Sequence, residues 1–324
     1  MKKIIVVLLS VLLLCSCGTS TSSSTAVSSS NKDNETILVG IVQLLPHEAL
    51  DAATQGFKDA LTAEFGDKVV FEEGNAAGES ANCATIVDGF VNDGVDLILA
   101  NATASLQAAA SATNTIPVLG TSITDYMSAL GLDSFDGVVG GNVSGTSDLA
   151  PLDLQADMIV DLLNPGTVGI LYCSNEPNSV YQTTEVQKLL EEKGIEVKLF
   201  SFADSNDIAS VTQQAVSESD CLYIPTDNTA AAYAETIYSV AGNTPIIAGE
   251  EGLCKKCGIA TLSISYYDLG VATGEMAVKI LKGEEDISSM AVQYAKETTY
   301  KYNPVICEAL GITVPDNYVA IDME

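Results

Sequence analysis

Clusters of short polar side chains follow several apolar runs of the sequence, at positions where they could hold a small solute. One apolar run covers residues 221–224, and the rim Pro-Thr-Asp-Asn-Thr (225–229) comes directly after it, before an alanine-rich segment. In open parallel sheets, ligands bind beyond the carboxyl ends of the strands. If residues 221–224 form such a strand, the polar residues after it form an exposed rim where a ligand can bind.

Seven rims of this kind occur along the chain, and together they could line one cleft. They comprise Gln43 with Pro46 and His47, and residues 75–78, 101–103, 121–125, 175–179, 225–229 and 249–251. Ser, Thr, Asn and Asp are also the preferred N-caps of helices. Each rim residue therefore has two compatible interpretations, as a helix cap or as a ligand contact.

Two of the rims suit the charged ends of a free amino acid. Residues 101–105 suit a carboxylate, because Thr103 and Ser105 offer hydroxyl groups and a helix start offers free backbone N–H groups. Asp227 and Glu250, at rims of the other half of the chain, could neutralise an ammonium group. The pattern predicts an amino acid held by its acid group on one side and by its amine on the other.

Catalytic and metal-binding chemistry find little support in the sequence. No G-x-S-x-G motif occurs, and no Ser–His–acid or Cys–His set can be assembled, so an enzyme is not expected. His47 is the only histidine, and neither a metal site nor a cofactor is expected. His47 could pack within a loop or form an aromatic wall above a ligand. Tyr126, Tyr266 and Tyr267 could stack on an aromatic solute.

Cys254 and Cys257 form a C-x-x-C motif that could bind zinc, perform redox chemistry or form a disulfide. Zinc requires two more ligands, and no second pair is evident. A thioredoxin-like motif would open a helix after an early strand, whereas this motif comes late in the chain. Outside the cytoplasm a local disulfide is the commonest outcome, so Cys254 and Cys257 are candidates for a disulfide, and the alternative is that both thiols stay reduced in an anaerobic niche.

Alternating strands and helices are predicted to position the rims. Apolar runs, each followed by residues with helical spacing, indicate parallel sheets covered by helices on both faces. The predicted strands cover residues 37–43, 68–73, 95–101, 116–121, 167–173, 195–202, 221–226, 244–250 and 259–265, and a helix is predicted at 266–283. The fold class is therefore α/β.

The strand and helix pattern restarts in the second half of the chain with the same order and near-equal spacing. Two similar Rossmann-like lobes with parallel sheets account for this repeat better than the alternative, one large doubly wound sheet. The first lobe is expected over residues 37–145, completed by about 263–285, and the second over 146–262, completed by about 286–324. Residues 137–151 are rich in glycine and are expected to cross between lobes, because glycine accommodates the dihedral changes of a hinge.

The N-terminus is typical of a bacterial lipoprotein signal (residues 1–17). Two lysines precede an apolar stretch too short to span a bilayer, and the sequence LCSC at 14–17 resembles a lipobox with Cys17 as the lipidated residue. Ordinary secretory cleavage is the alternative. Residues 18–36, rich in Ser and Thr, are predicted to form a flexible tether. The protein is therefore expected outside the cytoplasm, anchored to the cell membrane by lipid.

The formal net charge of −29 disfavours polyanionic partners. Nucleic acids and anionic membrane surfaces require stripes of basic side chains, and the sequence contains none. The charge does not restrict a small zwitterionic ligand, which senses only its own pocket. With 324 residues, the chain is long enough for two domains.

Seven segments resemble the ABC-transporter substrate-binding lipoproteins of the tryptophan/tyrosine-type group. They are VGIVQLLPHEALDAATQGFKDAL (39–61), NAAGESAN (75–82), DLILANAT (96–103), GTSITD (120–125), NVSGTSDLAP (142–151), IPTDNT (224–229) and ISYYDLG (264–270). The likeness covers nearly all of the chain from Thr36 to about Gly283. The resemblance implies the type I periplasmic-binding (Venus-flytrap) fold, amino-acid ligands that are often aromatic, and delivery to a membrane permease with its ATPase.

Carried over motif by motif, the resemblance also implies which residues line the cleft between the lobes. These residues are Gln43, His47, Asn101, Thr103, Thr124, Asp125, Asn178, Ser179, Asp227, Asn228 and Glu250. The C-x-x-C motif that follows Glu250 is not associated with this family.

The sequence thus predicts a lipid-anchored solute-binding protein of an ABC importer, a monomer that binds an aromatic amino acid (tyrosine, phenylalanine or tryptophan). The alternatives are a binding protein for a nucleoside or sugar, a surface receptor or adhesin, and an extracytoplasmic hydrolase. Turnover of a bound solute would indicate the hydrolase, and loss of uptake on deletion would separate transport from adhesion.

Overall fold

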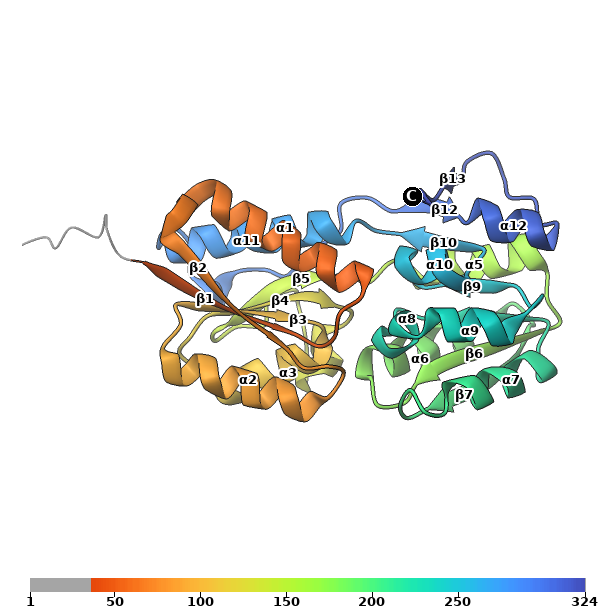
Figure 1. Ribbon diagram of the computed structural model, residues 1–324, viewed down its shortest axis with the longest axis horizontal. Coiled ribbons are helices and arrows are strands. Elements are labelled where there is room, and N and C mark those ends of the chain that lie inside the picture. The colour runs from red at the N-terminus through yellow and green to blue at the C-terminus, as the bar shows by residue number, and fades with distance from the viewer. Residues whose placement is uncertain (1–35, 324) are drawn as a thin grey trace, which may run out of the picture. The chain divides into compact units, whose positions relative to one another are not determined.

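The computed structural model describes residues 36–323. The predicted signal peptide (1–17), the predicted lipidation site Cys17 and nearly all of the predicted tether (18–36) lie outside the described residues. Within the described part of the chain, no helix has both the length and the apolar character that a bilayer crossing requires. The described chain alternates strand and helix, and its strands form two separate sheets (Figure 1).

The first sheet has the strand order β11-β5-β4-β3-β1-β2, and all of its strand pairs are parallel. Its strands are β1 (Ile37–Gln43), β2 (Val69–Asn75), β3 (Leu97–Asn101), β4 (Val118–Ile123), β5 (Val143–Ser147) and β11 (Gln293–Tyr294). Its helices are α1 (Glu48–Phe65), α2 (Ser80–Asp93), α3 (Thr103–Ala112), α4 (Tyr126–Leu130) and α11 (Tyr266–Leu281), with the short 3-10 helices η2 (Gly66–Lys68) and η3 (Ile287–Ser289). We call these elements the first lobe.

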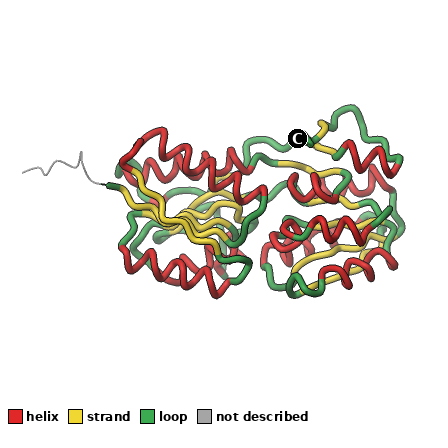
Figure 2. The backbone as a smooth tube through the Cα atoms, in the orientation of Figure 1, coloured by secondary structure: helices red, strands yellow, loops and turns green. Residues whose placement is uncertain are grey.

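Helices cover both faces of the first sheet, which explains why its strands are apolar on both sides (Figure 2). Val39 and Leu97 pack in one buried cluster with α1 and α11. Val42 and Ile98 point the other way and pack in a second cluster with α2 and α3.

α1 and α11 lie side by side on the same face of this sheet, although they are far apart in the sequence (Figure 1). Glycines make this close approach possible. A Cβ atom on Gly270 would lie 2.0 Å from the carbonyl oxygen of Ala53, and one on Gly56 would lie 2.1 Å from the carbonyl oxygen of Tyr267. The small residues at this helix pair therefore fix α11 to the first lobe.

The second sheet has the strand order β13-β12-β10-β9-β8-β6-β7, and only β12 pairs antiparallel to a neighbour, β10. Its strands are β6 (Thr167–Cys173), β7 (Glu196–Phe202), β8 (Cys221–Ile224), β9 (Ile246–Ala248), β10 (Ala260–Ser263), β12 (Thr299–Tyr302) and β13 (Val319–Ala320). Its helices are α5 (Leu152–Leu163), α6 (Pro177–Glu192), α7 (Ile208–Glu218), α8 (Asn228–Ala232), α9 (Ala234–Ala241), α10 (Glu251–Cys257) and α12 (Pro304–Leu310). We call these elements the second lobe.

Between residues 36 and 323, three segments cross from one lobe to the other: residues 148–151, 264–265 and 295–298. The third crossing differs from the sequence-based assignment of about 286–324 to the second lobe, because β11 pairs with β5 of the first sheet. A strand of two residues has no periodicity, so the sequence holds no signal for it. The crossings at 148–151 and 264–265 lie beside the carboxyl ends of strands from both sheets.

Candidate functional site

Strand ends from both lobes surround one small cavity, which we call the cleft cavity. It is lined by His47, Leu50, Ser122, Thr124, Asp148, Asn178, Thr226, Asp227, Asn228, Ala231, Glu250 and Tyr266. Its volume is about 10 Å³, close to the space that a single water molecule needs. A larger solute can therefore occupy it only if the two lobes move apart.

Ser122 provides the most distinctive feature of the first-lobe wall. Its backbone adopts φ = 57°, a conformation that costs energy for a residue with a side chain and that is found at functional sites. Its hydroxyl group is buried and has no hydrogen-bond partner among the described residues. A ligand atom in the cleft cavity could supply that partner.

The start of α3 lies beside Ser122, because the N–H of Ala102 donates to the carbonyl of Thr121 (3.1 Å). Ala102 occupies the N-cap position with φ = 88°, and no side chain caps the helix. The N–H groups of residues 103–105 have no hydrogen-bond acceptor among the described residues. A helix start with free N–H groups attracts anions.

Asp148 lies on the first crossing, where two hydroxyl groups donate to its carboxylate. Thr124 Oγ1 donates to Oδ1 and Tyr266 Oη donates to Oδ2, each over 2.9 Å. Burial raises the pKa of Asp148. The Tyr266 contact joins the crossing at 148–151 to the start of α11, directly after the crossing at 264–265.

The second-lobe wall is acidic, and its carboxylates cap helices. Asp227 accepts from the N–H groups of Ala230 (2.8 Å) and Cys173 (2.6 Å) at the start of α8. Glu250 caps α10 by accepting from the N–H groups of Gly252 (2.6 Å) and Leu253. Both carboxylates also line the cleft cavity.

These carboxylates have no basic side chain to neutralise them. No Lys lines the cleft cavity, and the chain contains no arginine. Burial raises the pKa of Glu250 to about 7, although the two N–H donors oppose this shift. Burial and the nearby Glu176 carboxylate raise the pKa of Asp227. Such perturbed acids inside a cleft are characteristic of functional sites.

A hydrogen bond joins the two lobes across the cleft cavity. His47 Nε2 lies 3.1 Å from Asn228 Oδ1, and since the amide oxygen can only accept, the imidazole must donate. The amide group of Asn228 donates to the Glu176 carboxylate (2.7 Å), which fixes its orientation. Burial lowers the pKa of His47, so the neutral ring is favoured.

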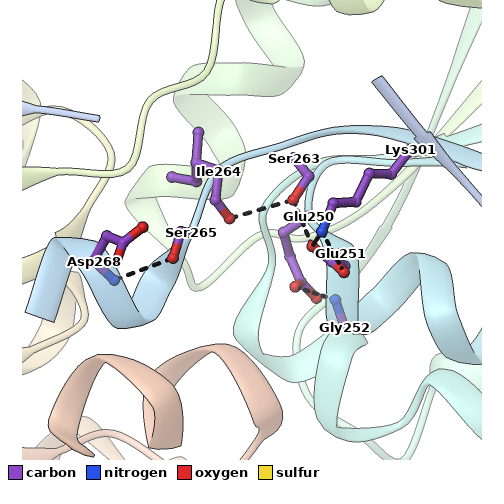
Figure 3. A network of polar contacts seen from close by, with 8 residues as sticks. All are labelled: Glu250, Glu251, Gly252, Ser263, Ile264, Ser265, Asp268 and Lys301. Atoms are coloured by element: carbon purple, nitrogen blue, oxygen red, sulfur yellow. Dashed lines mark hydrogen bonds and ion pairs between the residues drawn. The ribbon is translucent and has the colours of Figure 1, made fainter. Parts of the chain in front are cut away.

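Interactions behind α10 hold Glu250 in place (Figure 3). Lys301 of β12 donates to both carboxylate oxygens of Glu251 (2.8 and 2.7 Å), and Ser263 of β10 donates to the same group (2.6 Å). The first residue of α10 is thereby attached to two strands of the second sheet, which positions Glu250 at the rim.

Six of the residues predicted to line the cleft do line this cavity: His47, Thr124, Asn178, Asp227, Asn228 and Glu250. Five lie outside it: Gln43, Asn101, Thr103, Asp125 and Ser179.

Those five residues have structural contacts within their own lobes. Gln43 bonds to Asp51 and Thr54, and Asn101 donates to Thr54 Oγ1, all at the start of α1. Asp125 caps α4. Thr103 is buried at the start of α3, and Ser179 donates to the carbonyl of Thr226.

The predicted list of cleft residues left out six lining residues: Leu50, Ser122, Asp148, Thr226, Ala231 and Tyr266, of which Tyr266 was expected only as a residue that could stack on an aromatic solute. Ser122 and Thr226 belong to predicted rims, so the rim pattern pointed to them. Tyr126, a candidate for stacking, is instead buried in the first lobe, where its hydroxyl lies within hydrogen-bond distance of two acceptors, the carbonyls of Gly120 (3.2 Å) and Thr146 (3.1 Å). Tyr267 is exposed and donates to Asp59.

The possible Cys254–Cys257 disulfide is not formed in the structure, where both thiols are free and buried. The two residues are three positions apart on α10. Side chains with this spacing have Cβ atoms about 5–6 Å apart, whereas a disulfide needs about 3.5–4.5 Å. The helical geometry therefore keeps the two thiols apart. The described residues contain no cluster of His, Cys, Asp and Glu side chains able to hold a metal ion.

A second, larger cavity of about 620 Å³ lies next to the cleft cavity, with which it shares Glu250 and Tyr266. It is lined mainly by the crossings and by the flanks of α1 and α11 rather than by the carboxyl ends of strands. The smaller cavity is the better candidate for the ligand site, because the rims of both sheets converge there.

Comparison with known proteins identifies the family. The model of the family described as "ABC transporter substrate binding protein" matches residues 38–323. The chain belongs to this family. A curated relative, a tyrosine-binding protein from Clostridioides difficile (strain R20291), is 32% identical over 280 residues, which cover 85% of this chain and 81% of the relative. The resemblance inferred from the sequence is thus confirmed.

Two solved structures with 34% sequence identity to this chain differ in how well they superpose on it. A Streptococcus pneumoniae protein in complex with L-Trp is 34% identical, covers 87% of this chain and 97% of its own, and gives a TM-score of 0.82. A ligand-free, open substrate-binding protein with adhesive properties from Clostridium difficile is also 34% identical. The match covers 89% of this chain and 100% of the other chain, with a TM-score of 0.68.

A more distant structure confirms the predicted fold class. A leucine-binding protein from Thermotoga maritima is 14% identical, gives a TM-score of 0.60 and shares only the fold with this chain. The α/β architecture of two lobes with parallel sheets is that of the type I periplasmic-binding proteins.

Proposed function

We propose that this substrate-binding protein serves an ABC importer and binds an aromatic L-amino acid between its two lobes. The observation that carries the proposal is the opposite polarity of the two walls of the cleft cavity. The second lobe presents Asp227 and Glu250 without a basic side chain. On the first-lobe side the cavity is lined by the unpartnered hydroxyl of Ser122, and the uncapped start of α3 lies next to Ser122 without lining the cavity itself. An ammonium group fits the acidic wall of the second lobe, and a carboxylate fits the wall of the first lobe.

The carboxylate of the ligand is expected to bind without a cationic side chain, since the chain has no arginine and no Lys lines the cavity. The Ser122 hydroxyl and the N–H groups at the start of α3 are its donors. The N–H groups at the start of α8 and α10 are already taken by Glu176, Asp227 and Glu250. These contacts oppose the reverse orientation of the ligand.

The aromatic class rests on the relatives, one named for tyrosine and one solved with L-Trp. A neutral nucleoside or sugar offers no cation to pair with the buried acids Asp227 and Glu250, which disfavours that alternative. His47 and Tyr266 line the cavity and are the candidates for contact with the ligand ring.

Binding is proposed to act by closing the lobes. This chain superposes better on the L-Trp complex than on the open structure at equal sequence identity, and a direct hydrogen bond links its lobes. Ligand binding shifts such an equilibrium by its differential affinity for the closed form. The closed form would then deliver the solute to a permease and its ATPase. Attachment to the membrane through Cys17 belongs to the same proposal and rests on the sequence.

A thermal-shift screen tests the function directly. The protein without its predicted signal peptide is mixed with each of the common amino acids, several nucleosides and simple sugars. L-tyrosine, L-phenylalanine or L-tryptophan should raise the melting temperature by mass action, and the others should raise it less or not at all. Tyramine and the deaminated acid of tyrosine, which each lack one charged group, should also fail. Stabilisation by a nucleoside or sugar alone would contradict the proposal.

A further inference from the structure

The first turn of α8 binds two carboxylates from its own chain. Glu176 accepts from the N–H groups of Asn228 (3.0 Å) and Thr229 (2.8 Å), and Asp227 accepts from the N–H of Ala230 (2.8 Å). Three consecutive N–H groups of one helical turn thus hold two acidic side chains. The positive end of one short helix is shared by two carboxyl groups that repel each other when both are ionised.

Glu176 is buried but does not line the cleft cavity. It accepts five hydrogen bonds, from Asn178 Nδ2, Asn228 N and Nδ2, and Thr229 N and Oγ1. Both of its carboxyl oxygens accept: three of these bonds reach Oε2 and two reach Oε1. Its influence on a ligand must therefore pass through neighbouring side chains.

Asp227 is the neighbour that faces the ligand site. Only 1% of its surface is exposed, and it lines the cleft cavity. It accepts from the backbone N–H groups of Ala230 and Cys173, which carry no positive charge, so no cation compensates its charge. Burial first and the Glu176 charge second raise the pKa of Asp227 above its ordinary value of 3.8.

The other titratable groups around Asp227 do not supply a positive charge. Those that line the cavity or interact with the pair are Glu176 at the start of α6, the Cys173 thiol at the end of β6, His47 before α1, Asp148 on the first crossing, Glu250 before α10 and Tyr266 on α11. Lys256 acts on His47 and favours its neutral form.

We propose that Glu176 is a positioning residue of the ammonium site, which keeps Asp227 protonated until an ammonium ligand displaces that proton. The inference rests on the proposed function. The step is balanced: the ligand ammonium pairs with the Asp227 carboxylate, the O–H bond of Asp227 breaks, and one proton leaves to solvent. The total charge within the cleft near Asp227 stays the same, because the ammonium replaces the proton.

Calorimetry with the best aromatic amino acid tests this step. Titrations at about pH 6 in two buffers with very different ionisation enthalpies should give heats that differ by the release of about one proton per ligand. Affinity should also rise with pH, by up to about tenfold per pH unit below the pKa of Asp227. Equal heats in the two buffers, proton uptake, or an affinity independent of pH would overturn the inference.

A pair of variants assigns the effect to Glu176. Glu176→Gln removes the repelling charge and should release fewer protons and flatten the pH profile while the amino acid still binds. Glu196→Gln, an exposed glutamate of the same lobe, should behave like the wild type. If Glu176→Gln releases as many protons as the wild type, Glu176 does not tune Asp227. If Glu176→Gln fails to fold, the wild-type titrations remain decisive. Failure of every amino acid to bind would overturn the proposed function and this inference together, whereas binding without proton release overturns only the inference.

Discussion

The carboxylates Asp227 and Glu250 cap helices and line the cleft cavity at the same time. The sequence left open whether such residues cap helices or contact a ligand, and the structure shows the capping role. Two N–H donors would ordinarily favour an ionised carboxylate. The pKa of Glu250 is nevertheless raised to about 7. Burial without a counter-charge therefore raises this pKa by more than the two capping hydrogen bonds lower it. An ammonium ligand would supply this charge.

Asp227→Asn separates the two roles of this residue. Asn keeps the oxygen that caps α8, and Asp227 is proposed to carry no charge before the ligand binds, so the melting temperature of the ligand-free protein should change little. Amino-acid binding should weaken by about 2–5 kcal/mol, because the ammonium group loses its charged partner. Calorimetry and thermal melts measure the two effects. Unchanged affinity would remove Asp227 from the site.

The raised pKa of Glu250 predicts that the stability of the ligand-free protein depends on pH. Its pKa rises from 4.5 to about 7 on folding, so the folded state binds the proton more tightly than the unfolded state does. The resulting stabilisation is fully present below about pH 4.5 and is lost as the pH rises through about 7, a change of up to about 3 kcal/mol.

Urea melts across this pH range measure the effect. Glu250→Gln should flatten the decrease in unfolding free energy between acidic and neutral pH. His47 acts in the opposite direction, because its lowered pKa favours unfolding as the pH falls below 6.5. A wild-type profile that matches the Glu250→Gln profile would contradict the assignment.

At the residue scale, the sequence could identify polar rims but not which side chain of each rim faces the cavity. Thr124 lines it while its neighbour Asp125 caps α4. This choice depends on backbone dihedrals such as the positive φ of Ser122, which residue types do not encode. Asp148 was also missed, because a single acid on a predicted crossing has no pattern around it.

At the scale of elements, long segments were predicted well and short ones were not. The predicted strand at 37–43 and the helix at 266–283 correspond to β1 and α11. Their continuous apolar and helical periodicities extend over enough residues to be recognised. β11 and β13 contain two residues each and exist because tertiary contacts pair them, so local sequence cannot reveal them.

The packing of α1 against α11 predicts the effect of one substitution. Gly270→Ala would place a Cβ atom 2.0 Å from the carbonyl oxygen of Ala53, so the helices must separate. The free energy of unfolding should fall by about 1–3 kcal/mol, as measured by chemical denaturation.

Gly89→Ala is the matched control on α2, since a Cβ atom there meets nothing within 4 Å. It should be neutral or stabilise the protein by about 0.5–1 kcal/mol, the helix preference for alanine over glycine. If both variants have equal stability, the close approach of α1 and α11 is not required for folding.

At the scale of the whole molecule, three crossings allow the lobes to move and the His47–Asn228 hydrogen bond resists their separation. A bond of this kind contributes about 1 kcal/mol, enough to bias an equilibrium between open and closed forms without fixing it. Ligand binding would then complete the closure.

His47→Ala should therefore shift the ligand-free protein toward the open form. Small-angle X-ray scattering should report a larger radius of gyration than for the wild type, and a saturating amino acid should largely restore the smaller value. An unchanged radius in the absence of ligand would show that this contact does not influence closure.

The orientation of the ligand is the central claim, and a crystal structure of the protein with its tightest-binding amino acid tests it most directly. The ammonium nitrogen should lie within hydrogen-bond distance of Asp227 or Glu250, and the carboxylate should lie against Ser122 and the start of α3. A ligand bound with its carboxylate toward the second lobe, or bound outside the cleft, would contradict it.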